Sequence, residues 1–88
     1  MSKYLLEMPH TMEQCMEALD ETAANPILLD QIWWGCMAGN HTAWAMVEAG
    51  SQTEALNMVP AVVRPQAVVT EIQQFSEQQI RDMHKKAA

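Results

Sequence analysis

Apolar residues recur along this chain with two different spacings. In residues 12–23 they fall at intervals of three and four, and acidic or amide side chains occupy many of the positions between them. In residues 67–75 successive side chains instead alternate between two faces. The first spacing predicts an amphipathic helix that stops at Asn25-Pro26, and the second predicts a strand.

Three further runs predict strands, and a turn joins two of them. Residues 4–8 form a short, mostly apolar run that ends at Pro9. Residues 27–37 are dense in β-branched and aromatic side chains and predict a long strand. Residues 41–49 follow the turn signal Ala38-Gly39-Asn40, so we expect them to pair with residues 27–37 as a hairpin.

Three helix starts show the pattern of a capping box, in which a Ser or Thr is followed three residues later by Glu or Gln. The three patterns are Thr11–Gln14, Ser51–Glu54 and Ser76–Gln79. They predict helices over residues 12–23, from residue 51 to about residue 59, and over about residues 77–86. The second helix is expected to end near Val59, because Pro60 lacks the N–H that would continue it.

The predicted elements follow one another in the order β-α-β-β-α-β-α. This order is that of a split βαβ, or ferredoxin-like, unit with one additional helix at the C-terminus. We therefore expect a single α+β domain over residues 1–88, with an antiparallel βαββαβ sheet and a C-terminal helix. A chain of this length buries too little surface to be very stable as an isolated monomer.

One face of the predicted sheet should be left open, because the two helices of a βαββαβ unit cover only the other face. In residues 42–49 the small side chains of Ala43, Ala45 and Val47 alternate with Trp44 and Met46. The small residues suit close helix packing, so the larger ones should lie on the open face with one tryptophan of the Trp33-Trp34 pair. We expect a homodimer or a larger homo-oligomer that packs through this face. Three carboxylates, Glu7, Glu48 and Glu71, are expected on the same face.

Composition narrows the possible functions and location. Eleven acidic and five basic residues give a net charge of −6, which disfavours a nucleic-acid partner. The N-terminus has no apolar core typical of a signal peptide, and no run is long enough to span a membrane. Cys15 and Cys36 form no CxxC pair, so we expect two reduced thiols and a cytoplasmic protein.

The predicted topology brings three residues with chemically versatile side chains to one end of the sheet. His10 follows the first strand, Cys36 lies near the end of the second, and His41 begins the third. Two imidazoles and a thiol suit zinc, nickel or copper, and a family of nickel-binding ferredoxin-like proteins has a similar general architecture. The same histidines could alternatively act as a general acid and base.

The middle third of the chain resembles a known family. Trp34, Ala38-Gly39, His41 and the helix opening Ser51-x-x-Glu54-Ala55-Leu56 are similar to muconolactone isomerases of the dimeric α/β-barrel superfamily. The resemblance implies a small-molecule-binding or isomerase-like protein that needs no cofactor, and no catalytic residue is carried over from it. The expected ligand pocket is lined by His10, Trp33, Cys36, His41 and Trp44. The alternatives are a nickel-, zinc- or copper-binding protein using His10, Cys36 and His41, and a structural or regulatory oligomer without a pocket.

Overall fold

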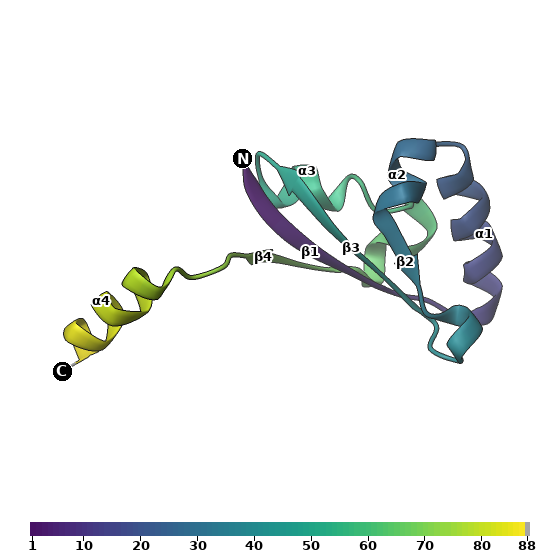
Figure 1. Cartoon of the computed structure of the whole chain (residues 1–88). Coiled ribbons are helices and arrows are strands. Elements are labelled where there is room, and N and C mark those ends of the chain that lie inside the picture. The colour runs from purple at the N-terminus through teal and green to yellow at the C-terminus, as the bar shows by residue number, and fades with distance from the viewer. Residues whose placement is uncertain (88) are drawn as a thin grey trace.

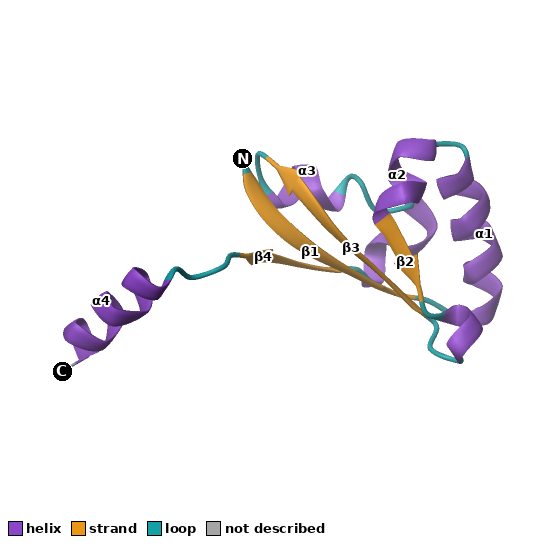
Figure 2. Cartoon of the chain, in the orientation of Figure 1, coloured by secondary structure: helices purple, strands orange, loops and turns teal. Residues whose placement is uncertain are grey.

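A four-stranded antiparallel sheet with helices against one face forms the body of the computed structural model, which describes residues 1–87 (Figures 1 and 2). The strands are β1 (Ser2–Pro9), β2 (Ile32–Trp34), β3 (Thr42–Ala49) and β4 (Val68–Ile72), arranged in the order β2-β3-β1-β4. The α+β class expected from the sequence is confirmed, and the arrangement is compatible with a ferredoxin-like fold. None of the helices within residues 1–87 combines the length and apolar composition needed to cross a bilayer.

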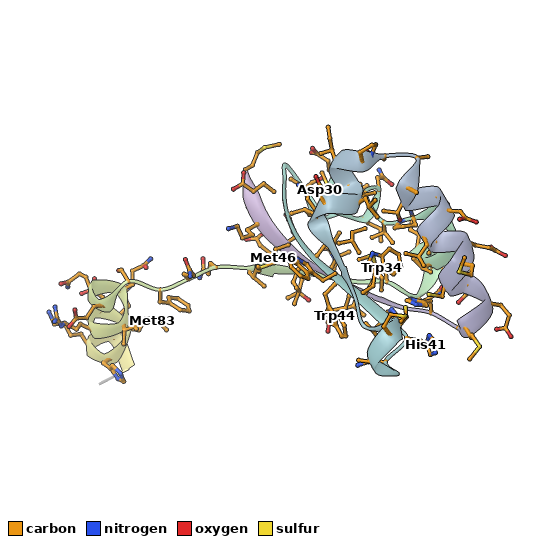
Figure 3. The ribbon with its side chains drawn as sticks, turned by 45° about the vertical axis from the view of Figure 1, so that its right-hand side comes forward. Asp30, Trp34, His41, Trp44, Met46 and Met83 are labelled. Atoms are coloured by element: carbon orange, nitrogen blue, oxygen red, sulfur yellow. The ribbon has the colours of Figure 1, made fainter. Side chains whose placement is uncertain are left out.

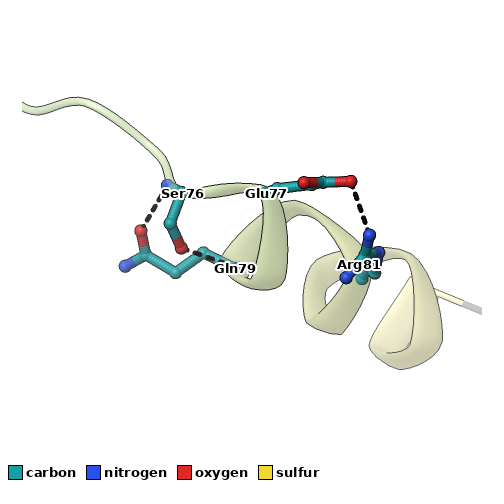
Figure 4. A network of polar contacts seen from close by, with 4 residues as sticks. All are labelled: Ser76, Glu77, Gln79 and Arg81. Carbon is teal, nitrogen blue, oxygen red and sulfur yellow. Dashed lines mark hydrogen bonds and ion pairs between the residues drawn. The ribbon is translucent and has the colours of Figure 1, made fainter.

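Helices begin where the capping patterns predicted them. The α-helices are α1 (Met12–Ala23), α2 (Pro26–Gln31), α3 (Gln52–Leu56) and α4 (Glu77–Ala87), and two 3-10 segments are η1 (Cys36–Ala38) and η2 (Ala61–Gln66). At the start of α4, the Ser76 hydroxyl accepts a hydrogen bond from the Gln79 N–H, and the Gln79 side chain accepts one from the Ser76 N–H (Figure 4). Thr11 and Gln14 make the same reciprocal pair at α1. These bonds satisfy N–H groups that a helix start otherwise leaves unpaired.

The long strand predicted over residues 27–37 is wrong, because α2 occupies its first half. The Asn25 side chain accepts a hydrogen bond from the Leu28 N–H at 3.3 Å, and Pro26 is the first helical residue. Asn at the cap and Pro at the first position are a favoured helix start, and here they outweigh the strand propensity of the residues that follow. Only Ile32–Trp34 remains as β2. The helix expected to reach Val59 also ends earlier, at Leu56, and β4 ends at Ile72 rather than at residue 75.

The core lies between the sheet and the helices. Alternate β1 residues Tyr4, Leu6 and Met8 face it, and each is at least 95 % buried. Ala43, Ala45 and Val47 of β3 face the same way and are equally well buried. Their small side chains allow the helices to approach the sheet closely, as the alternation in this segment predicted.

The opposite face of the sheet is uncovered within residues 1–87. The register places Leu5 beside Met46, Glu7 beside Trp44 and Val68, and Trp33 beside Trp44. Figure 3 shows Trp44 and Met46 on the side of the sheet away from α1, and Trp34 on the side of α1. We call the surface formed by Leu5, Trp33, Trp44, Met46 and Val68 the open face.

Glu71 does not lie on the open face, contrary to expectation. It pairs with Tyr4 across β1 and β4, and its carboxylate accepts a hydrogen bond from the Tyr4 hydroxyl at 3.4 Å. Since Tyr4 faces the helix side, Glu71 faces it too, whereas Glu7 and Glu48 alternate onto the open face. The predicted cluster of three carboxylates is therefore not formed.

Candidate metal centre

Four side chains with metal-binding atoms meet where the ends of three strands approach the start of α1. They are His10, Cys15, Cys36 and His41, and one donor atom from each lies within 4.8 Å of all the others. Around a tetrahedral zinc ion, bonds to sulfur and nitrogen would separate neighbouring donors by about 3.3–3.8 Å. No pair of donors is therefore more than about 1.5 Å wider than the spacing that a tetrahedral ion requires.

His10 is held in one orientation by the strand that precedes it. Its Nδ1 lies 2.9 Å from the Met8 carbonyl oxygen, and its backbone N–H donates to the His41 carbonyl oxygen at 3.0 Å. Because a carbonyl can only accept, Nδ1 is the protonated nitrogen of the neutral ring, and in that tautomer Nε2 carries the lone pair. Nε2 lies 3.3 Å from the Cys36 sulfur. A backbone carbonyl that fixes the tautomer in this way is the usual support for a histidine metal ligand.

Cys36 lies at the centre of the cluster. It is the first residue of η1, directly after the close turn at Gly35, and its sulfur touches both His10 and Cys15. The Cys15 sulfur, in the first turn and a half of α1, is 3.0 Å away. The Thr11 cap fixes where α1 begins and so directs Cys15 toward the sheet rather than toward solvent.

The protonation of Cys15 reflects this neighbour. The hydrogen bond with the Cys36 thiol, followed by burial, raises the pKa of Cys15 from 9.0 to about 11. Without a metal, Cys15 therefore keeps its proton at neutral pH. A zinc ion would remove that proton on binding, because metal coordination stabilises the thiolate.

His41 completes the cluster from the loop before β3. Its ring centre is 6.0 Å from that of His10, with the planes at 74°. Its Nδ1 is buried and has no hydrogen-bond partner among the described residues. A buried ring nitrogen without a partner is costly unless it binds something, and metal coordination would satisfy it. Trp34 packs edge-on against His10 at 6.0 Å between ring centres.

The structure divides the five residues that were predicted to line one ligand pocket. His10, Cys36 and His41 come together on the helix side of the sheet, as the strand topology indicated. Trp33 and Trp44 lie on the open face instead. A hollow of about 420 Å³ between α1, α2 and η2 is lined by none of the five.

Cys15 is the member of the cluster that sequence reasoning did not assign to it. It occupies a position in the apolar stripe of the first helix, where a buried cysteine is ordinarily a small hydrophobic residue. Two signals in the sequence could have identified it. The start of this helix lies at the same end of the sheet as His10, and His10 precedes Cys15 by the same interval of five residues by which Cys36 precedes His41.

Comparisons of the chain with protein-family models, with curated proteins and with solved structures give no match.

Proposed function

We propose that this chain is a transition-metal-binding protein in which His10, Cys15, Cys36 and His41 hold one zinc ion. The observation that supports it is the mutual approach of the four donor atoms within 4.8 Å. The four residues come from a strand end, a helix, a 3-10 segment and a loop, so local sequence proximity does not explain their convergence.

Zinc fits this donor set better than the other metals considered. Two thiolates and two imidazoles around a tetrahedral ion are a common structural zinc site, and the two thiolate charges balance the ion. Nickel(II) and copper(II) favour planar arrangements with nitrogen and oxygen donors. The test below distinguishes the three metals.

The proposed site has the character of a structural or storage site. Four protein ligands fill a tetrahedral ion and leave no position for a substrate, whereas catalytic zinc keeps one open. An ion here would tie the start of α1 to the ends of β1 and the β2–β3 hairpin. The reduced thiols that it requires are compatible with the cytoplasm.

The geometry gives less support to the small-molecule or isomerase-like function implied by the muconolactone isomerase resemblance. The proposed pocket residues lie on two faces of the sheet, and His10 is 91 % buried in the cluster. Independently of the metal, we also propose that the chain has a ferredoxin-like fold and forms homo-oligomers through its open face. It is favoured by the exposure of Trp33 (75 %) and Met46 (62 %) on that face.

The experiment that tests metal binding is titration of the fully reduced protein with cobalt(II), followed by displacement with zinc, nickel and copper. Cobalt takes the same tetrahedral donors as zinc and then absorbs visible light, with an additional near-ultraviolet band from each thiolate. We expect one cobalt per chain with both signals, and complete displacement by one zinc. Native mass spectrometry of the same samples counts the bound ions.

Variants of the cluster separate this site from adventitious binding. Cys36→Ser and His41→Ala should each lower zinc affinity by about 100-fold or more, since each removes a ligand. His84→Ala is the matched control, because His84 is an exposed histidine on α4. Reduced wild-type protein that binds no stoichiometric metal, or a His41→Ala variant that binds as well as His84→Ala, would refute the proposal.

A further inference from the structure

We propose that the C-terminal arm, residues 73–87, packs on the open face of a second copy of this chain, so that two copies exchange arms. The proposal is independent of the metal site. It rests on two apolar surfaces that residues 1–87 leave uncovered, one on the sheet and the other on α4.

The arm extends away from the body of the molecule. Figure 1 shows α4 at the end of an extended segment that continues from β4, well separated from the helices that cover the sheet. The long axis of the molecule is 51 Å, about twice the other two, which are 28 and 22 Å. The radius of gyration is 16.0 Å, whereas a compact chain of this length would have about 12 Å.

The arm has an apolar side that its own domain does not cover. Phe75, Ile80 and Met83 are 46–53 % exposed, and Ile80 and Met83 fall on one stripe of α4. Phe75 and Met83 also line a shallow hollow of about 280 Å³, which offers room for a protruding side chain. A helix of 11 residues is marginal in water without tertiary packing, so α4 requires a surface to pack against.

The open face has the complementary properties. Its apolar residues come from all four strands, and Trp33, Met46 and Val68 are at least 50 % exposed. Glu7, Glu48 and Lys3 lie among them or at their edge, and Lys3 pairs directly with Glu48. A contiguous apolar patch with aromatic residues and a polar rim is typical of a protein interface.

Charge favours the same pairing. Residues 1–72 contain nine acidic and two basic side chains, whereas residues 73–88 contain two acidic and three basic ones. The last turn of α4 contains Lys85 and Lys86 beside His84, whereas Arg81 is already paired with Glu77. The arm would therefore be attracted electrostatically to the acidic body of another copy, and this attraction would speed their association.

A second copy of the chain would cover both the open face of the sheet and the apolar side of the arm. The arm continues along the direction of β4, so that α4 lies beyond the end of its own sheet (Figure 2). Reciprocal exchange between two copies covers two open faces and two arms by a single two-fold axis. It leaves neither surface exposed and requires no other protein.

Photo-crosslinking between isotopically distinct copies tests the arrangement. Full-length protein with a benzoylphenylalanine in place of Met83 is prepared with ¹⁴N and with ¹⁵N, mixed in equal amounts, unfolded, refolded together and irradiated. We expect crosslinked peptides that join α4 to β1, β2 or β3 and that contain one peptide of each isotope. The same substitution at Gln78, on the opposite side of α4, is the matched control and should crosslink to the sheet at least about tenfold less.

Each other result overturns the exchange. Crosslinks between α4 and the sheet that join only peptides of the same isotope, with no mixed pairs, would show that the arm folds back on its own domain. Crosslinks between two α4 helices would show that the arms pair with each other. A monomer without crosslinks would show that the arm has no partner in this chain.

A second measurement uses variants that cannot disturb the core, since α4 lies outside it. The double variant Ile80→Ser/Met83→Ser should weaken the dimer by about tenfold or more in sedimentation equilibrium, because both side chains would be buried at the interface. Gln78→Ser should change it by less than about twofold. An unchanged dimer in the double variant would contradict the proposal.

Discussion

The Nε2 atom of His10 lies 3.3 Å from the sulfur of Cys36, although 26 positions separate the two residues in the chain. The other ring nitrogen of His10 is engaged by the Met8 carbonyl, so the free lone pair is directed at the sulfur. This contact joins η1, the segment between β2 and β3, to the end of β1. Donor atoms of Cys15, on α1, and of His41, in the loop before β3, lie beside this contact.

Zinc should stabilise the folded protein, because the four ligands come together only in the folded chain. At a free zinc concentration one hundred times the Kd, the expected gain is about 2.7 kcal/mol, or a Tm increase of roughly 10 °C or more. Thermal unfolding with zinc and with a chelator measures this difference. The Tm difference between zinc and chelator should vanish in His41→Ala and persist in His84→Ala. An equal difference in both variants would mean that zinc binds at another site.

Oxidation should convert the metal-free cluster into a disulfide. The sulfurs of Cys15 and Cys36 are 3.0 Å apart, and a bond of about 2.05 Å requires only a small approach. Oxidised glutathione would accept the two electrons and two protons of the thiols and leave as two reduced glutathione molecules. Intact mass spectrometry should show the loss of two hydrogen atoms.

Zinc provides the control for disulfide formation, because a bound zinc ion would coordinate the sulfurs of both Cys15 and Cys36. Zinc-loaded protein should oxidise at least about tenfold more slowly than metal-free protein. Oxidation at the same rate with and without zinc would mean that the two sulfurs are not metal ligands.

Much of the fold follows from short-range signals in the sequence. The hydroxyls of Thr11, Ser51 and Ser76 each cap a helix, and alternation in residues 42–49 correctly separates the buried side of the sheet from the open side. The error at residues 27–37 has a local cause. Asn25-Pro26 predicts the end of one helix, but the same two residues also begin the next.

The cluster was predictable only in part, because its members depend on different kinds of information. His10, Cys36 and His41 lie at strand ends, and strand order alone predicts that they are neighbours. Cys15 lies on a helix, where periodicity shows that it is buried but not which group it faces. Which group Cys15 faces depends on how α1 is oriented against the sheet, and tertiary packing determines that orientation.

Tyr4 should ionise at a higher pH than a free tyrosine. Burial, and next the charge of Glu71, raise the pKa of Tyr4 above 10.0. Because the folded pKa is higher than the unfolded one, this group's stabilising contribution is complete below pH 10 and is lost as pH rises through the raised value. Phenolate absorbance measures the titration directly, since the chain has one tyrosine.

Substitution of the neighbouring carboxylate tests the cause of the Tyr4 shift. Glu71→Gln should lower the pKa of Tyr4, because the Glu71 carboxylate raises it both by its charge and through its hydrogen bond with the hydroxyl. Glu48→Gln is the control, since Glu48 faces the other side of the sheet. An equal change in the two variants would mean that Glu71 does not act through its contact with the hydroxyl.

Gly35→Ala should weaken both the fold and metal binding. A Cβ at this position would lie 2.7 Å from the Asn40 carbonyl oxygen and 3.0 Å from the Trp44 ring, so the hairpin must shift. We expect a stability loss of roughly 1–3 kcal/mol in urea unfolding, typical of overpacking at a rigid site. Because Cys36 is the next residue, cobalt affinity should fall as well.

Gly39→Ala separates the two effects of the Gly35 variant. Gly39 has a φ of 87°, which an alanine adopts at a cost of about 1 kcal/mol, but a Cβ there would meet no atom within 4 Å. The chain would be destabilised without displacement of Cys36, so cobalt affinity should stay within about twofold of wild type. If Gly39→Ala lowered cobalt affinity as much as Gly35→Ala, the loss would reflect general destabilisation rather than the position of the Cys36 sulfur.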